Sequence, residues 1–108
     1  MKIKFANGVV KNCAAPTEQK LFRTAGGITS GAGWLLILRL TGNATSTELD
    51  EILTSENISK LEFTADEENG EEKTIFCIDG YNKITASTIR HAESATSAYT
   101  EIQMSKGA

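Results

Sequence analysis

The sequence AGGITSGAGWLLILRL, residues 25–40, joins a glycine-rich segment to an apolar run that starts at Trp34. Apolar side chains occupy consecutive positions up to Leu38, so both faces of an extended chain are apolar here. Such a run predicts a buried strand, and we expect residues 33–42 near the middle of the structure, covered on both sides. Residues 25–33 have no clear apolar period, and we expect them to form a flexible loop that leads into this strand.

The glycines of this loop do not form a phosphate-binding motif. Gly26 and Gly31 have the spacing of the two P-loop glycines, but Ala32 and Gly33 occupy the positions that require Lys and Ser or Thr. A dinucleotide-binding loop follows a strand and opens a helix, whereas these glycines precede a strand. The apolar run is also far shorter than the roughly 20 residues of a membrane-spanning helix. We therefore expect a loop at the surface or at a protein interface.

This loop supplies the candidate interaction site. Flexible chain loses conformational entropy when it becomes ordered, with no visible return inside one monomer, which favours contact with a neighbouring subunit. Trp34 has two interpretations: it packs in the core because it opens a buried strand, or it anchors an interface, where Trp is enriched. The candidate interface residues are Leu21, Phe22, Gly27, Ile28 and Trp34.

Length and charge limit the class of protein. A chain of 108 residues favours a single domain over residues 1–108. The net charge is -3 and there is no dense Lys/Arg cluster, which argues against a nucleic-acid-binding surface. The first residues, MKIKFANG, contain no apolar signal-peptide core, so we expect a protein made in the cytoplasm that does not bind a membrane. Cys13 and Cys77 are then expected to be thiols, because disulfides are rare in that compartment.

The dipeptide Asn7-Gly8 predicts a hairpin at the start of the chain. It suits a type I′ turn, because both central residues of that turn need a positive φ. A two-residue turn there places Phe5 opposite Val10, so that Ile3, Phe5 and Val10 share one face.

The dipeptide Asn69-Gly70 predicts a second hairpin, within residues 59–80. The pairs that follow from a two-residue turn are Asp66 with Lys73, Phe63 with Phe76, and Leu61 with Ile78. The apolar members of these pairs share one face, so the turn and the hydrophobic pattern agree. The two Phe rings are expected to form a cross-strand pair.

One helix and two further strands complete the expected fold. Thr45 and Glu48 have the spacing of a capping box, and an apolar stripe of Leu49, Ile52 and Leu53 follows them. Further strands are expected over residues 83–89 and 99–105. Strands outnumber helices and the hairpins imply antiparallel pairing. The expected fold is mainly β (α+β): a small antiparallel β-sandwich or partly open barrel with one short helix packed on it.

No catalytic or metal-binding pattern stands out. His91, the single histidine, lies in a polar segment between two expected strands, and a catalytic site would need it packed against a nucleophile. The acidic run DEENGEE, residues 66–72, does not place Gly at the sixth position of an EF-hand loop. Two cysteines and one histidine are too few for a usual zinc site. We expect no enzyme activity, no cofactor and no metal.

Three segments resemble small proteins encoded in phages and prophages of Firmicutes. They are MKIKFANGVV at residues 1–10, STELDEILTSENISKLEF at 46–63, and IDGYNKITASTIRHAESATSAYTEIQMSKG at 78–107. The Gly80-Tyr81 step, the KI that follows it and the closing EIQMSKG carry most of the likeness, and the glycine loop is not part of it. The resemblance implies a virion structural protein in a repeated assembly, and it implies no catalytic residues.

The function expected from this resemblance is that of a phage virion protein, either a capsid-decorating protein or a tail or baseplate component. Its partners would be capsid or tail subunits and further copies of itself. A small acidic β domain is compatible with this, since edge strands and loops can reach neighbouring subunits. The alternative is a small soluble binding module of the inhibitor or immunity type, which an acidic surface also suits.

Overall fold

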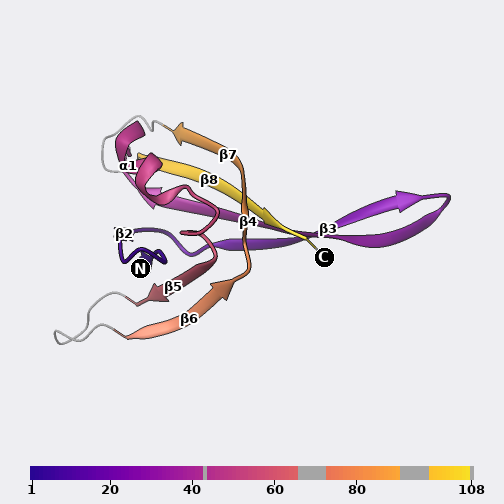
Figure 1. The fold of residues 1–108 in the computed structure, drawn as a ribbon, viewed down its shortest axis with the longest axis horizontal. Helices are drawn as coiled ribbons and strands as arrows, with labels where there is room; N and C mark the ends of the chain where they lie inside the picture. The colour runs from indigo at the N-terminus through magenta and orange to yellow at the C-terminus, as the bar shows by residue number, and fades with distance from the viewer. Residues whose placement is uncertain (43, 66–72, 91–97, 108) are drawn as a thin grey trace.

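The computed structural model describes residues 1–42, 44–65, 73–90 and 98–107, and it contains two four-stranded antiparallel sheets and one short helix (Figure 1). The first sheet has the order β2-β1-β5-β6, and its strands are β1 (Lys2–Lys4), β2 (Val10–Asn12), β5 (Lys60–Thr64) and β6 (Thr74–Asp79). The second sheet has the order β3-β4-β8-β7, and its strands are β3 (Thr17–Ala25), β4 (Ile28–Thr41), β7 (Lys83–Arg90) and β8 (Tyr99–Lys106). The helix is α1 (Ser46–Ile52).

This architecture confirms the expected fold class, a small β-sandwich with one helix, and neither sheet closes into a barrel. One core cluster joins the two sheets and the helix. Its members from the first sheet and the chain beside it are Ile3, Phe5, Leu61, Phe63 and Ile78, and those from the second are Leu36, Leu38, Leu40, Ile102 and Met104. The remaining members are Cys13, Ile52 of α1, Ile58 and Tyr81, which lies between β6 and β7. No helix within the described residues is long and apolar enough to cross a membrane.

β4 is an inner strand of its sheet, as expected, but it is covered on one face only. Leu36, Leu38 and Leu40 point into the core and are buried, whereas Leu35 and Ile37 on the other face are half-buried. The expectation of cover on both sides is therefore wrong. The apolar outer face is shielded in part by its neighbours within the sheet, where Leu35 lies opposite Gln19 of β3.

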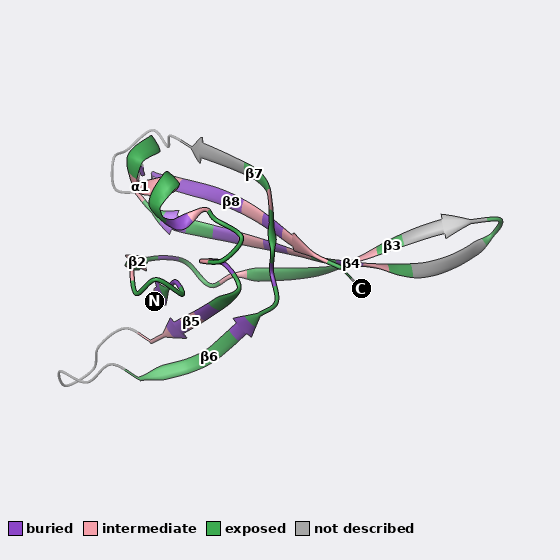
Figure 2. Ribbon diagram, in the orientation of Figure 1, coloured by how far each residue is buried: buried purple, intermediate pink, exposed green. Residues whose placement is uncertain are grey.

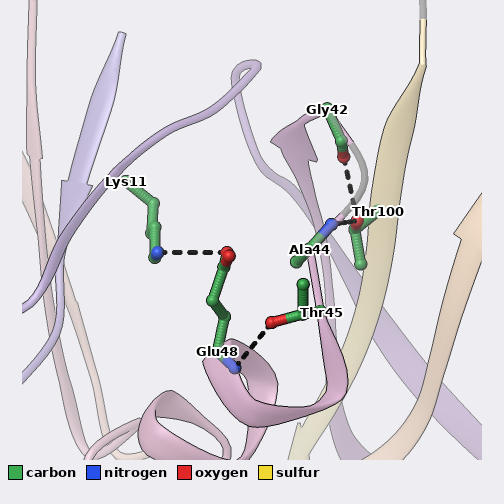
Figure 3. Close-up of polar contacts among 6 residues, drawn as sticks. All are labelled: Lys11, Gly42, Ala44, Thr45, Glu48 and Thr100. Carbon is green, nitrogen blue, oxygen red and sulfur yellow. Dashed lines mark hydrogen bonds and ion pairs between the residues drawn. The ribbon is translucent and has the colours of Figure 1, made fainter.

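The helix begins as the capping residues predict. The Glu48 backbone N–H donates to Thr45 Oγ1 at 3.2 Å, which satisfies one of the unpaired amides of the first turn (Figure 3). The Glu48 carboxylate accepts from Lys11 Nζ at 3.3 Å and so ties the helix to β2 (Figure 3). The predicted stripe faces the core: Ile52 is fully buried, and Leu49 and Leu53 pack against the cluster.

The register of the first hairpin differs from the prediction by one residue. Ile3 lies opposite Lys11, and Val10 is 50% exposed instead of sharing the buried face of Ile3 and Phe5. A slip of one residue moves every side chain of a strand to the opposite face, which explains the exposure of Val10.

The cause of this slip is the length of the turn. Phe5 N–H donates to the Val9 carbonyl at 2.9 Å, and Gly8 N–H donates back to the Phe5 carbonyl, which closes a loop over residues 6–8. Gly8 has a φ of 91°, the left-handed conformation that three-residue hairpin loops require. Asn-Gly is compatible with both loop lengths, and the longer loop places Val9, in place of Val10, against the core.

The second hairpin has the predicted inner register. Leu61 lies opposite Ile78 and Phe63 opposite Phe76, and the two Phe rings stack with centroids 4.7 Å apart. Beyond Phe63 an irregularity shifts the register by one residue, and the predicted turn at residues 69–70 lies outside the described residues.

Thr100 of β8 is a buried polar residue that joins β4 to the start of α1. Its Oγ1 donates to the Gly42 carbonyl and accepts from Ala44 N–H, both at 2.9 Å (Figure 3). One hydroxyl therefore satisfies two backbone groups at the point where the chain leaves the sheet.

Replacing Thr100 by valine keeps the shape of the side chain but leaves both backbone groups without this partner. We expect Thr100→Val to lower the free energy of unfolding by about 1–3 kcal/mol. Thr100→Ser retains the hydroxyl and loses one methyl group, and we expect a loss near the lower end of about 0.5–1.5 kcal/mol. Urea unfolding of both variants checks this, and a valine variant as stable as the wild type would contradict the two hydrogen bonds.

Candidate interaction surface

Residues 25–33 do not form the expected flexible loop; they belong to a long β-hairpin. β3 pairs with β4 from Thr17 opposite Ile37 out to Ala25 opposite Ile28. Gly26 and Gly27 form the turn with φ angles of 59° and 83°, and a two-residue hairpin turn of type I′ needs two such positive angles. The glycines that suggested flexibility are therefore the residues that allow a tight reversal.

The outer part of this hairpin projects from the rest of the molecule, and we call residues 20–34 the arm (Figure 1). The molecule measures 53 × 32 × 22 Å, and its radius of gyration of 15.3 Å exceeds the roughly 13 Å expected for a compact chain of this length. The arm lies beyond the first sheet, which lies beside the C-terminal part of β4 (Figure 1).

One face of the arm continues the core-facing side of the second sheet. Trp34 lies two residues before the buried Leu36 and opposite Lys20, so alternation places Lys20, Phe22 and Trp34 on the side that carries the core residues. None of the described residues covers that side fully here: Phe22 is 64% exposed and Trp34 is 36% exposed. In Figure 2 buried residues are concentrated in the body, and the described parts of the arm are mostly exposed or intermediate.

Lys20, Phe22 and Trp34 form what we call the arm cluster. Lys20 Nζ lies 5.7 Å from the centroid of the Phe22 ring and 6.0 Å from that of the Trp34 ring, within range of cation–π attraction. Gly31, opposite Phe22, has no side chain, and the Lys20 stem passes over it. The arm thus presents two aromatic rings with a cation between them.

The base of the arm is fixed to the body through Tyr81. This side chain is fully buried, and its hydroxyl donates to Glu18 Oε2 of β3 at 2.8 Å. Lys106 Nζ lies 4.6 Å from the Tyr81 ring centroid and donates to the Asp79 carbonyl at 2.9 Å. Tyr81 therefore contacts β3 just before the arm begins and the end of β8, and Lys106 links it to Asp79 at the end of β6.

Burial, and then the hydrogen bond and charge of Glu18, raise the pKa of Tyr81 well above its ordinary value. The folded state holds the phenol proton more tightly than the unfolded state, so the contribution to stability is complete below about pH 10 and declines as the pH rises above it. We expect a loss of up to about 1.4 kcal/mol per pH unit from this group. Urea unfolding of wild type and Tyr81→Phe between about pH 9 and about pH 11 isolates it; equal slopes would contradict the assignment.

A second exposed apolar surface lies on β6, at the edge of the first sheet. Ile75 is 46% exposed and Phe76 is 38% exposed, although they point to opposite faces, and the exposed Cys77 follows. The hydrophobic pattern placed Phe76 on one face with Phe63 and did not indicate this surface. The signal that could have found it is the apolar run Ile75–Ile78, which suits a strand with apolar side chains on both faces.

The structure brings together some of the predicted interface residues. Phe22 and Trp34 belong to the arm cluster, and the exposure of Trp34 is against the core interpretation, while its role at an interface stays a prediction. Leu21 points to the other face of the arm and is half-buried, and Gly27 lies at the tip. The Ile28 side chain lies outside what the structure describes. Lys20 belongs to the cluster and was missed, because a lone lysine in a polar segment gives no signal.

Among the described residues, no three His, Cys, Asp or Glu side chains group together in a way that could hold a metal ion. Cys13 is buried beside β4 and Cys77 is exposed on β6, and both are thiols. His91 and the acidic run 66–72 lie outside the described residues.

The arm cluster and the β6 edge are therefore the surfaces on which a function can be argued. No protein-family model, no curated protein and no solved structure matches this chain.

Proposed function

We propose that this chain is a structural protein of a phage particle, a capsid-decorating protein or else a tail or baseplate component, which acts through protein–protein contacts without catalysis. Its partners are capsid or tail subunits and further copies of itself. The observation that carries the proposal is the projecting arm with its exposed cluster of Lys20, Phe22 and Trp34. The resemblance of the chain's ends and middle to small phage proteins supplies the direction.

The physical basis is that exposed aromatic side chains favour burial against a partner. Trp, Tyr and Arg dominate interface energetics, and a ring that already stands on a rigid hairpin loses little entropy on binding. The arm is ordered by the β3–β4 pairing and anchored at Tyr81, so it can present Phe22 and Trp34 in a fixed orientation.

The test is to locate the protein in particles. Gradient-purified virions from a host that produces the phage are analysed by quantitative mass spectrometry, and gold-labelled antibodies then distinguish the capsid from the tail. We expect a constant copy number per particle. A Trp34→Ser variant should attach at least about tenfold less, and Val10→Ser, on an exposed position away from the arm, should attach normally. Absence of the protein from intact particles would contradict the proposal, and its recovery bound to one host enzyme would favour an inhibitor.

A further inference from the structure

Two strands at the edges of different sheets expose apolar side chains that nothing in the described parts of the chain covers. β3, which carries Leu21 and Phe22 of the arm, is an edge strand of the second sheet. β6, which carries Ile75 and Phe76, is an edge strand of the first sheet. We propose that the arm of one copy binds a second copy by pairing its β3 edge with the β6 edge of that neighbour. The inference rests on the proposed function in treating the arm as a binding element, and it names the partner.

The backbone chemistry of the two edges is complementary. An edge strand has a row of N–H and C=O groups that point away from its sheet, and a second strand can satisfy them. Pairing β3 with β6 would extend the first sheet by the two strands of the neighbour's arm. Side chains on both faces would then gain cover, because β6 exposes Phe76 on its core side and Ile75 on its outer side, and the arm supplies Phe22 and Leu21 on alternate faces.

Charge favours the β6 edge of the second copy, and not its arm, as the surface that the arm binds. Residues 20–34 contain Lys20 and Arg23 and no acidic residue, although the whole chain has a net charge of -3. The sequence of residues 66–72, which leads to β6, contains five acidic residues and no basic one. Two arms side by side would bring like charges together, whereas the sequence that leads into β6 carries the opposite charge.

The interface is heterologous, because it joins two different surfaces that each copy carries. Such contacts continue from copy to copy, and they end in a ring or run on as a filament. β6 has six residues, so the buried area falls near or below the roughly 1,200 Å² of weak complexes. We therefore expect association only at high concentration, the condition that attachment to a particle provides.

Sedimentation velocity of the full chain over a concentration series tests the proposal. Wild type should associate as concentration rises, and less so at high salt. Phe22→Ser removes the arm contact and Ile75→Lys places a charge on the β6 edge. Each variant should weaken association at least about tenfold. Val10→Lys is the matched control: Val10 is also half exposed on an edge strand of the first sheet, and this variant should associate like wild type.

Mixing the two defective variants distinguishes a contact between arm and β6 edge from a contact between two identical surfaces. Phe22→Ser retains an intact β6 edge and Ile75→Lys retains an intact arm, so the mixture should form a heterodimer and stop there. An arm-to-arm contact would instead leave Ile75→Lys able to associate alone, and would overturn the proposal. Both variants should show the circular dichroism spectrum of the wild type, since both side chains are exposed at the surface.

Cys77 supplies a second, covalent readout that does not depend on affinity. A Leu21→Cys, Cys77→Ser variant is mixed with wild type under mild oxidation, and a disulfide is expected between the arm cysteine of one copy and Cys77 of the other. Ser55→Cys, Cys77→Ser is the control, with an exposed cysteine beyond α1. Disulfides between two arms, or equal yields from both variants, would overturn the proposal.

Failure of self-association can be distinguished from failure of the proposed function. A wild-type chain that stays monomeric at every concentration and gives no specific disulfide overturns self-association. Attachment to virions that still depends on Trp34 would leave the proposed function standing, with a capsid or tail subunit as the partner of the arm.

Discussion

Phe63→Ala lowers the free energy of unfolding by about 3–5 kcal/mol, the range for removal of a fully buried Phe side chain. Phe63 is completely buried on β5, and it packs in the cluster that joins both sheets. The loss combines the apolar area that alanine no longer buries with the cavity that the rigid sheets cannot close. Urea unfolding followed by tryptophan fluorescence measures it, because Trp34 is the single tryptophan of the chain.

Phe76→Ala provides the matched comparison within the same stacked pair. The two rings share one contact at 4.7 Å, but Phe76 is at the edge of the sheet and is partly exposed. We expect its replacement to cost clearly less, about 1–2 kcal/mol. Equal losses at the two positions, or a loss below about 0.5 kcal/mol at Phe63, would contradict the assigned faces of the β5–β6 hairpin.

Gly33→Ala should also destabilise the fold strongly, by at least about 2 kcal/mol. Gly33 has a φ of 119°, which residues with a Cβ rarely adopt, and a Cβ there would overlap the Lys106 carbonyl of β8. That overlap involves backbone on both sides, so relief requires the β4–β8 pairing to open where the arm leaves the body.

Gly31→Ala is the control two residues away. Gly31 has no positive φ, and a Cβ there would meet only the flexible Lys20 stem, at 3.7 Å from Cε. We expect a change within about 0.5 kcal/mol by urea unfolding. If both alanine variants were equally stable, the close approach of Gly33 to β8 would be contradicted.

Local signals in the sequence predicted much of the fold. The helix and most strands follow along the chain from turn dipeptides, the apolar pattern and the capping residues, whereas β3 and the order of strands within each sheet were not predicted. Thr45 caps α1 because its hydroxyl reaches an amide three residues away, an interaction that needs no other part of the chain. The pairing of Phe63 with Phe76 was predictable because the apolar pattern and the turn agreed.

Other features depended on choices that the sequence leaves open. Asn7-Gly8 fits loops of two or three residues, and the longer loop is the one that places Val9 against the core and leaves Val10 exposed. Gly26-Gly27 is compatible with a flexible loop or with a tight turn between two strands. The pairing of β3 with β4 decides for the turn, and it converts an expected loop into a rigid arm.

The sequence by itself determined the β class, the helix and the inner register of the second hairpin. The tertiary structure alone decided which apolar side chains are exposed. β4 has 14 residues and spans roughly 46 Å, whereas β6, the longest strand of the first sheet, has six and spans roughly 20 Å. The first sheet therefore ends before β4 does, and Trp34 lies on the part of β4 that the first sheet does not reach. Alternation specifies which face a side chain takes, but whether another sheet reaches it depends on the length of elements distant in sequence.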